Sequence, residues 1–308
     1  MILTVTLNTA LDLVYTVPAL TPHAAHRVTE VVERPGGKGV SAARVLAALG
    51  HEAVVTGFAG GPAGNTLRGL LAPLPVRDAL VPVSGATRRT VTVTDAAAGG
   101  TTRFSEPGPV VTPAEWAAFA SAYEELLDGA RAVALCGSLP RGVHVGAYGE
   151  LVRRARRAGV PVLLDTGGEP LRRGVAARPD LLKPNADELA ALTGYRDPLR
   201  AARDARRRGA HAVVASLGPD GLLAVTPDGA WAAPAPARVA GDPTGAGDAV
   251  VAGLLSALAE GAPWPERLAR AAALATATVY APAAGEFDPD RYGELLERVR
   301  VTEEATAA

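Results

Sequence analysis

The segment 112–164 reads TPAEWAAFASAYEELLDGARAVALCGSLPRGVHVGAYGELVRRARRAGVPVLL. It opens with a capping box at Thr112–Glu115, with proline at the first helical position, and its helical pattern runs to Leu127. A strand, a second helix and a second strand follow, at 132–135, about 145–158 and 160–164. This alternation predicts a parallel sheet with helices on its faces.

The same alternation extends over most of the chain. The start, 1–7, is a short β-rich run, and the next helical pattern ends near Leu49. Further helices are expected at 185–192, 198–208, about 246–260 and 264–281, and further strands at 211–215 and 222–225.

Two segments interrupt this alternation. Together, 11–34 and 88–106 hold four β-type runs without helices, and Ala98-Gly99-Gly100 is a hairpin signal. We predict that these segments form a small separate sheet. Because the chain leaves the main domain and returns to it twice, this sheet is a candidate lid over a core made of 1–10, 35–87 and 107–308.

Composition narrows the class of protein. The 308 residues are enough for two domains of ~150 residues, or for one large α/β domain with an appendage. An apolar fraction of 48% and a net charge of −1 indicate a folded protein without a broad attraction to nucleic acid or anionic membranes. Cys136 is the only cysteine, which excludes an intramolecular disulfide and a thiolate-rich zinc site. We expect a cytoplasmic protein, since a single cysteine suits a reducing compartment and the start, 1–7, lacks the basic region of a signal peptide. The longest apolar stretch, 249–259, is also too short to span a bilayer.

A run of small residues leads directly into the long helical pattern near residue 249: Gly241-Asp242-Pro243-Thr244-Gly245-Ala246-Gly247-Asp248. Backbone N–H groups at such a helix start converge on an anion, and the helix dipole reinforces them. Asp248 adds a carboxylate beside the anion, where it can take a proton from a hydroxyl that attacks phosphorus. A simple helix cap is the alternative role for Asp248.

Only two of the 31 basic residues are lysines, Lys38 and Lys183. A coding preference for arginine explains most of this imbalance, yet both positions are candidates for sites that need a compact ammonium group. Lys38 lies in Gly36-Gly37-Lys38-Gly39, where the glycines let backbone approach a ligand, although the spacing is not that of a Walker A loop. Lys183 precedes a second capping box at Asn185–Glu188, which accounts for the two capping residues without any ligand.

Other polar residues give weaker signals. The turn Ser216–Gly221 follows a predicted strand and is suited to wrap a nucleotide, but an ordinary β-turn explains it equally well. Cys136 ends a predicted core strand, where packing is its expected role. The five histidines show no metal-ligand spacing.

Taken in order, these clusters resemble the phosphofructokinase B family of ribokinase-like sugar kinases, with the closest likeness to its 1-phosphofructokinase and tagatose-6-phosphate kinase branch. The resemblance implies a three-layer α/β/α core with a mostly parallel central sheet, a small β-sheet lid, and ATP-dependent kinase activity. Nine matching stretches extend over about residues 2–285: Thr6–Asp12, Gly36–Gly39, Thr87-Arg88, Glu106–Pro109, Gly137–Pro140, Asp165-Thr166, Lys183–Asn185 with Glu188, Ser216–Gly218 and Thr244–Asp248.

The resemblance also implies roles for the matched residues, with ATP and Mg²⁺ as cofactors. The catalytic group consists of the general base Asp248 and an anion hole made by the amides of Gly245, Ala246 and Gly247. The nucleotide group consists of Lys183, Asn185, Ser216, Gly218 and Gly221, and Asn185 and Glu188 place the metal ion through water. The acceptor group consists of Asp12, Gly37, Lys38, Ser41 and Ser138, with Arg88 and Arg103 reaching in from the lid strands.

The sequence departs from the family pattern on the sugar side. Ser41 stands where asparagine is usual, and the other altered positions are Thr9, Thr90, Thr92 and Ser105. We predict a kinase of a ketohexose phosphate, namely tagatose 6-phosphate or fructose 1- or 6-phosphate. An unphosphorylated sugar or a nucleoside as acceptor stays open, as does a sugar-phosphate sensor without turnover. The exposed edges of the lid sheet predict a homodimer that forms through the lids.

Overall fold

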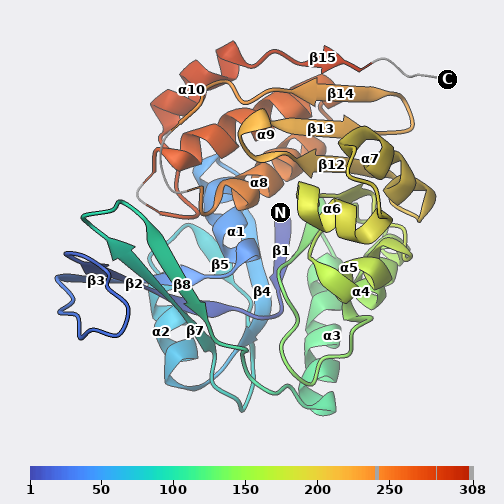
Figure 1. The fold of residues 1–308 in the computed structure, drawn as a ribbon. Helices are drawn as coiled ribbons and strands as arrows, with labels where there is room; N and C mark the ends of the chain where they lie inside the picture. Colours follow the sequence, from blue (N-terminus) through green and yellow to red (C-terminus); the bar gives the residue numbers. More distant parts are fainter. Residues whose placement is uncertain (240–242, 282, 305–308) are drawn as a thin grey trace.

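The computed structural model describes residues 1–239, 243–281 and 283–304. Its central sheet has eleven strands in the order β15-β14-β13-β12-β11-β10-β9-β1-β4-β5, with β6 paired to β4 (Figure 1). The strands are β1 (Ile2–Thr6), β4 (Ala53–Ala59), β5 (Val76–Asp78), β6 (Val81–Pro82), β9 (Ala132–Cys136), β10 (Val162–Asp165), β11 (Leu181–Leu182), β12 (Ala212–Ser216), β13 (Leu222–Val225), β14 (Ala230–Ala233) and β15 (Thr302–Glu303). All pairs from β5 to β12 are parallel, whereas β12 to β15 pair antiparallel. The mostly parallel sheet is confirmed.

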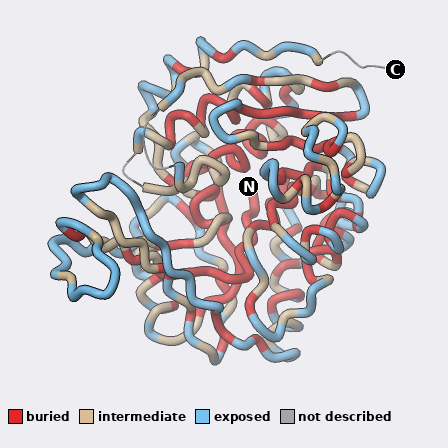
Figure 2. The backbone as a smooth tube through the Cα atoms, viewed as in Figure 1, coloured by how far each residue is buried: buried red, intermediate tan, exposed pale blue. Residues whose placement is uncertain are grey.

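Two helical layers cover the faces of this sheet. One layer contains α1 (Lys38–Ala48), α2 (Gly61–Leu71), α8 (Ala246–Ala259), α9 (Trp264–Val279) and α10 (Pro289–Arg298), and the other contains α3 (Pro113–Leu127), α4 (Ala147–Arg157), α5 (Gly168–Val175), α6 (Ala186–Thr193) and α7 (Pro198–Arg207). Alternate residues of β1 enter the two cores, since Ile2 packs with the first layer and Leu3 with the second. Figure 2 shows these buried segments running through the middle of the molecule. The predicted three-layer architecture is therefore confirmed.

Local sequence signals place several helix starts. The capping boxes predicted at Thr112 and Asn185 are both present, with reciprocal hydrogen bonds to Glu115 and Glu188. Cys136 is buried, as predicted, and this burial raises the pKa of its thiol. No helix in the described part of the chain combines the length and hydropathy needed to cross a bilayer.

The four strands predicted outside the alternation form a separate sheet in the order β3-β2-β7-β8. Its strands are β2 (Ala10–Val17), β3 (Glu30–Gly36), β7 (Arg88–Asp95) and β8 (Thr101–Ser105), and β7 and β8 make the predicted hairpin. This small sheet projects from one side of the main body, and much of its backbone is exposed or half-buried (Figures 1 and 2). Its role as a lid and the division of the chain into core and lid stay predictions.

The carboxyl ends of the parallel strands bring several predicted residues to one edge of the central sheet. Asn8 follows β1, Ser138 follows β9, Asp165 ends β10, Lys183 follows β11 and Ser216 ends β12. Ligands bind at this edge in open α/β sheets because loops and helix starts meet there.

Candidate active site

The predicted anion-binding turn leads into α8. Gly245 is the residue before the helix and has a left-handed φ of 90°, which favours glycine. The amide of Ala246, predicted to face the anion, donates to the carbonyl oxygen of Pro243 at 3.0 Å. Asp248 lies in the first turn of α8, as predicted. Residues 241 and 242, which open the predicted motif, lie outside the described residues.

Both lysines of the chain meet at one carboxylate oxygen. Lys38 Nζ and Lys183 Nζ each lie 3.3 Å from Oδ1 of Asp165. The Lys183 side chain is only 4% exposed and Asp165 1%, whereas the Lys38 side chain keeps 42% of its surface exposed. Asp165 Oδ2 has no hydrogen-bond partner within the described ranges. Asp165 lies in one of the matched stretches but had no predicted role, so this junction is a finding of the structure.

The charges of this junction act on the carboxyl of Asp248. Burial raises the pKa of its carboxyl from 3.8 to about 7, and the negative charge of Asp165 adds to the rise. Lys38, Lys183 and a hydrogen bond from Ser41 oppose it. Burial also disfavours the charged form of Lys38, but Asp165 and Asp248 outweigh this effect and raise the pKa of its ammonium group. Asp248 therefore has a pKa suited to accepting a proton near neutral pH.

Ser41 is thus placed beside Asp248. It is a buried residue of α1, and its hydroxyl hydrogen-bonds the Asp248 carboxylate. Its predicted contact with the acceptor is untested, but its partner in the protein is the candidate base.

Two other residues predicted for the acceptor, Arg88 and Arg103, lie near Asp12 on β2. Burial raises the pKa of the Asp12 carboxyl, while a hydrogen bond from Thr90 and the charges of Arg103 and Arg88 lower it. Asp12 and Thr90 lie opposite each other in the β2–β7 register. Arg103 Nη2 lies 3.3 Å from Oγ1 of Thr244, so a side chain of the small sheet reaches the turn before α8.

Ser138 and Gly37 join this side from the core. Asn8 Nδ2 donates to Oγ of Ser138 at 3.1 Å, and Arg88 Nε donates to the Asn8 carbonyl oxygen at 3.2 Å. Gly37 precedes α1 with a φ of 118°, and a Cβ there would lie 2.6 Å from Cγ2 of Thr6. Glycine lets the backbone at Lys38 approach β1 closely.

Four of the five predicted nucleotide residues, all except Lys183, line one cavity of about 710 Å³. The helices α8 and α9 contribute small or apolar side chains to its lining, as is usual for a small-molecule pocket. Lining residues include Asn185, Ser216, Gly218, Gly221, Ala246, Gly247, Ala272, Ala275, Thr276 and Val279. The cavity therefore extends from the anion turn to the end of β12, with Lys183 Nζ 3.8 Å from the position that a Cβ of Gly247 would take.

Comparison with known proteins assigns the chain to a family. A model of the pfkB family of carbohydrate kinases matches residues 3–291. The chain belongs to this family. It is 41% identical over 294 residues to 1-phosphofructokinase from Rhodobacter capsulatus, covering 94% of this chain and 92% of that protein. The predicted phosphotransferase with an alcohol group as acceptor is confirmed.

Solved structures support the fold of this carbohydrate kinase. Phosphofructokinase-2 from Escherichia coli matches with a TM-score of 0.89 and 31% identity, over 96% of this chain and 98% of that one. A possible 1-phosphofructokinase from Thermotoga maritima matches with a TM-score of 0.90 and 28% identity, over 99% and 100% of the two chains.

The metal-binding residues predicted for this carbohydrate kinase serve as a helix cap. Glu188 N donates to Asn185 Oδ1 at 2.8 Å, and Asn185 N donates to Glu188 Oε2 at 2.9 Å. Within the described residues no group of three His, Cys, Asp or Glu side chains forms a metal cage. Mg²⁺ typically keeps several waters and takes one or two carboxylates plus substrate phosphates. The unpaired Oδ2 of Asp165 and the Glu188 carboxylate fit that donor set.

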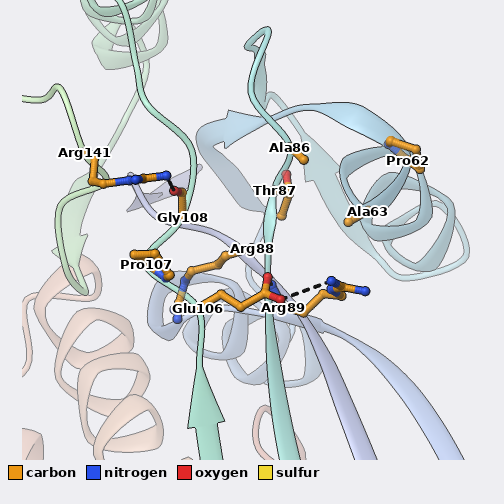
Figure 3. Close-up of a pocket in the computed structure, with 10 residues that line it drawn as sticks. All are labelled: Pro62, Ala63, Ala86, Thr87, Arg88, Arg89, Glu106, Pro107, Gly108 and Arg141. Carbon is orange, nitrogen blue, oxygen red and sulfur yellow. Dashed lines mark hydrogen bonds and ion pairs between the residues drawn. The ribbon is translucent and has the colours of Figure 1, made fainter.

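A second cavity of about 400 Å³ lies at the base of the small sheet (Figure 3). Arg88 was predicted for the acceptor site, whereas Arg89 and Arg141 were not. Arg89 is paired with Glu106, at 3.1 Å between Nη2 and Oε1, and Arg141 Nη2 donates to the Gly108 carbonyl oxygen at 3.2 Å. Of these three arginines, only Arg88 connects the cavity with Asp12, since its charge acts on the Asp12 carboxyl.

Proposed function

We propose that this carbohydrate kinase transfers the γ-phosphoryl group of ATP to a hydroxyl of a phosphorylated ketohexose. The observation that carries the proposal is the Asp248 carboxyl, with a pKa of about 7, at the start of a helix and beside two lysines that share Asp165. Fructose 1-phosphate is the first acceptor to test because the Rhodobacter capsulatus relative is named a 1-phosphofructokinase. Tagatose 6-phosphate and fructose 6-phosphate follow.

In the proposed reaction Asp248 accepts the proton of the attacking hydroxyl. A bond forms between that oxygen and the γ-phosphorus, and the bond from the phosphorus to the bridging oxygen of ADP breaks. The amides of Gly245 and Gly247 stabilise the negative charge on the transferred group by hydrogen bonding. The Ala246 amide adds a third hydrogen bond once it gives up its bond to the Pro243 carbonyl oxygen. Such transfer depends on alignment and charge neutralisation, so these groups suffice without a covalent intermediate.

The lysines neutralise phosphate charge in this proposal. Lys183 faces the nucleotide phosphates and Lys38 the acceptor side, while Asp165 keeps both ammonium groups in position. When bound, Mg²⁺ would supply further charge neutralisation, and Glu188 and Asn185, together with Oδ2 of Asp165, would hold it through water. Ser216, Gly218 and Gly221 line the nucleotide cavity.

The small sheet is proposed to act as the lid of the acceptor site. Asp12 accepts hydrogen bonds from sugar hydroxyls, and Arg88 and Arg103 contact the acceptor phosphate. Support comes from the position of Arg103, which already reaches Thr244 beside the anion turn. Closure of such a sheet excludes water, which would otherwise hydrolyse ATP.

A panel of acceptors tests the substrate class. With Mg-ATP, we expect one ketohexose phosphate to give a kcat/KM roughly 10- to 100-fold above those of fructose and ribose, since hydrogen bonds to a charged group contribute about 1.5–3 kcal/mol. ADP release in a coupled assay is the measurement, with fructose 1-phosphate, fructose 6-phosphate and tagatose 6-phosphate as the phosphorylated members.

Two results would contradict the proposal. Turnover confined to unphosphorylated sugars or nucleosides would show that the acceptor carries no phosphate. Binding of a sugar phosphate without any ADP release would favour the sensor without turnover.

We further propose that the kinase is a cytoplasmic homodimer that assembles through its small sheets. Val31 on β3 and Phe104 on β8, the two edge strands, are large exposed apolar side chains. Light scattering at micromolar concentration is expected to give twice the chain mass of 31.3 kDa, and Phe104→Arg to lower it. A monomer mass for the unmodified chain would exclude this assembly.

A further inference from the structure

A single carboxylate joins the small sheet to the core. Glu286 Oε1 lies 2.7 Å from Nη1 of Arg34 on β3 and 2.7 Å from Nη2 of Arg44 on α1. Arg44 Nη1 also donates to the carbonyl oxygen of Ala284 at 3.0 Å. We call Arg34, Arg44 and Glu286 the Glu286 bridge. It connects residues more than 240 positions apart in the chain.

The segment 283–286, which carries Glu286, packs against two residues close to Asp248. These are Gly245 in the anion turn and Ser41 on α1. A Cβ on Gly245 would lie 2.7 Å from Cα of Ala284, so the anion turn rests directly on this segment. A Cβ on Gly285 would lie 3.1 Å from Cα of Ser41, whose hydroxyl hydrogen-bonds Asp248. Because the backbones approach this closely, the segment cannot move toward Gly245 or Ser41 unless the groups around Asp248 move too.

The other end of the bridge lies beside the acceptor residue. Arg34 is the direct neighbour of Asp12 in the antiparallel β2–β3 register. A movement of this strand pair therefore moves Asp12 and Arg34 together, and Arg34 transmits it to Glu286.

We propose that Glu286 is a positioning residue that sets the anion turn and Asp248 relative to Asp12. The inference rests on the proposed roles of Asp248 and Asp12. Ion pairs with partial exposure contribute little to global stability, so the effect of the bridge is expected in geometry. Phosphoryl transfer is sensitive to such geometry, because misplacement of reacting groups by about 1 Å lowers rates up to ~100-fold.

Alanine variants at both ends test this role. Glu286→Ala is expected to lower kcat about tenfold and to raise the KM of the acceptor, with the KM of ATP changed less than about twofold. Arg34→Ala is expected to change kcat and the acceptor KM in the same way. The double variant should lower kcat no further than Glu286→Ala alone, because each substitution removes the same connection between β3 and the core. Glu33→Gln, an exposed carboxylate on the same strand, is the matched control and should behave like the unmodified chain.

Hydrogen exchange gives a readout that does not need turnover. In Glu286→Ala, amide exchange is expected to accelerate in peptides covering 30–36 and 243–248, with a similar thermal midpoint, whereas Glu33→Gln leaves both unchanged. Unchanged exchange at 243–248 in Glu286→Ala would overturn the inference, as would single-variant effects on kcat that multiply in the double variant. If the unmodified chain phosphorylates none of the acceptors, the proposed function fails and exchange alone decides the role of Glu286.

Discussion

Asp248→Asn is expected to lower kcat by roughly 10²- to 10⁴-fold, the range over which a general base contributes. The amide has nearly the shape of the carboxylate but cannot accept the hydroxyl proton, so binding of both substrates should persist. ADP release in a coupled assay measures the loss, and equilibrium binding of ADP checks that the nucleotide site is intact. A kcat within about threefold of the unmodified value would remove Asp248 from the catalytic role.

The pH profile is the second readout of this prediction. Asp248 acts only as carboxylate, so kcat/KM of the unmodified kinase should rise with pH to a plateau, with a midpoint near the pKa of about 7. Because the folded pKa lies above the ordinary value of 3.8, the folded state binds this proton more tightly than the unfolded state does. Ionisation therefore costs stability progressively between about pH 4 and pH 7.

The Asp248→Asn variant avoids that cost, because its amide does not ionise, and this gives the prediction its control. The free energy of unfolding of Asp248→Asn at pH 8 should be no lower than that of the unmodified chain. Lost activity together with lost stability would point to unfolding, and the kcat comparison would then be repeated with Asp248→Ala, which also lacks the base.

Local patterns predicted much of the fold because several elements carry their own signals. The capping boxes at Thr112 and Asn185 mark helix starts through side chains only three residues apart. Three helices, α2, α5 and α10, escaped prediction. The first begins within Gly60-Gly61-Pro62-Ala63-Gly64, a composition typical of loops, and only its packing of Leu67 and Leu71 into the core makes it helical.

The site was predictable residue by residue but not as an arrangement. Lys38 and Lys183 were assigned to opposite substrates from separate motifs. The β10–β11 pairing places Lys183 beside Asp165, and the start of α1 brings Lys38 to the same oxygen. The hydrogen bond from Ser41 to Asp248 and the Glu286 bridge likewise join segments that are distant in sequence. Nothing local in a sequence records such contacts, since they depend on strand order and register.

Asp165→Asn is expected to lower both stability and activity. The amide removes the negative charge that the two ammonium groups share at 3.3 Å, and Lys183 is too buried to regain water. Breaking a buried ion pair costs about 3–5 kcal/mol of unfolding free energy, and the lower end applies because Lys38 is partly exposed. Urea denaturation measures this loss, with Asp78→Asn as the control. Asp78 pairs with Arg68 at 2.6 Å in a more exposed setting, where the cost should not exceed about 1 kcal/mol.

The activity of Asp165→Asn distinguishes a loss of lysine positioning from a general loss of stability. With both lysines displaced, kcat of Asp165→Asn should fall roughly 100-fold, the effect of misplaced reacting groups. Adding Lys38→Met to Asp165→Asn removes one of the two unpaired charges, so part of the stability should return while kcat stays low. If instead the single variant matches Asp78→Asn in both measurements, the two ammonium groups keep their places without Asp165. The lysines would then be held by the backbone of β11 and α1 alone, and the shared carboxylate would serve only to raise the pKa of Asp248.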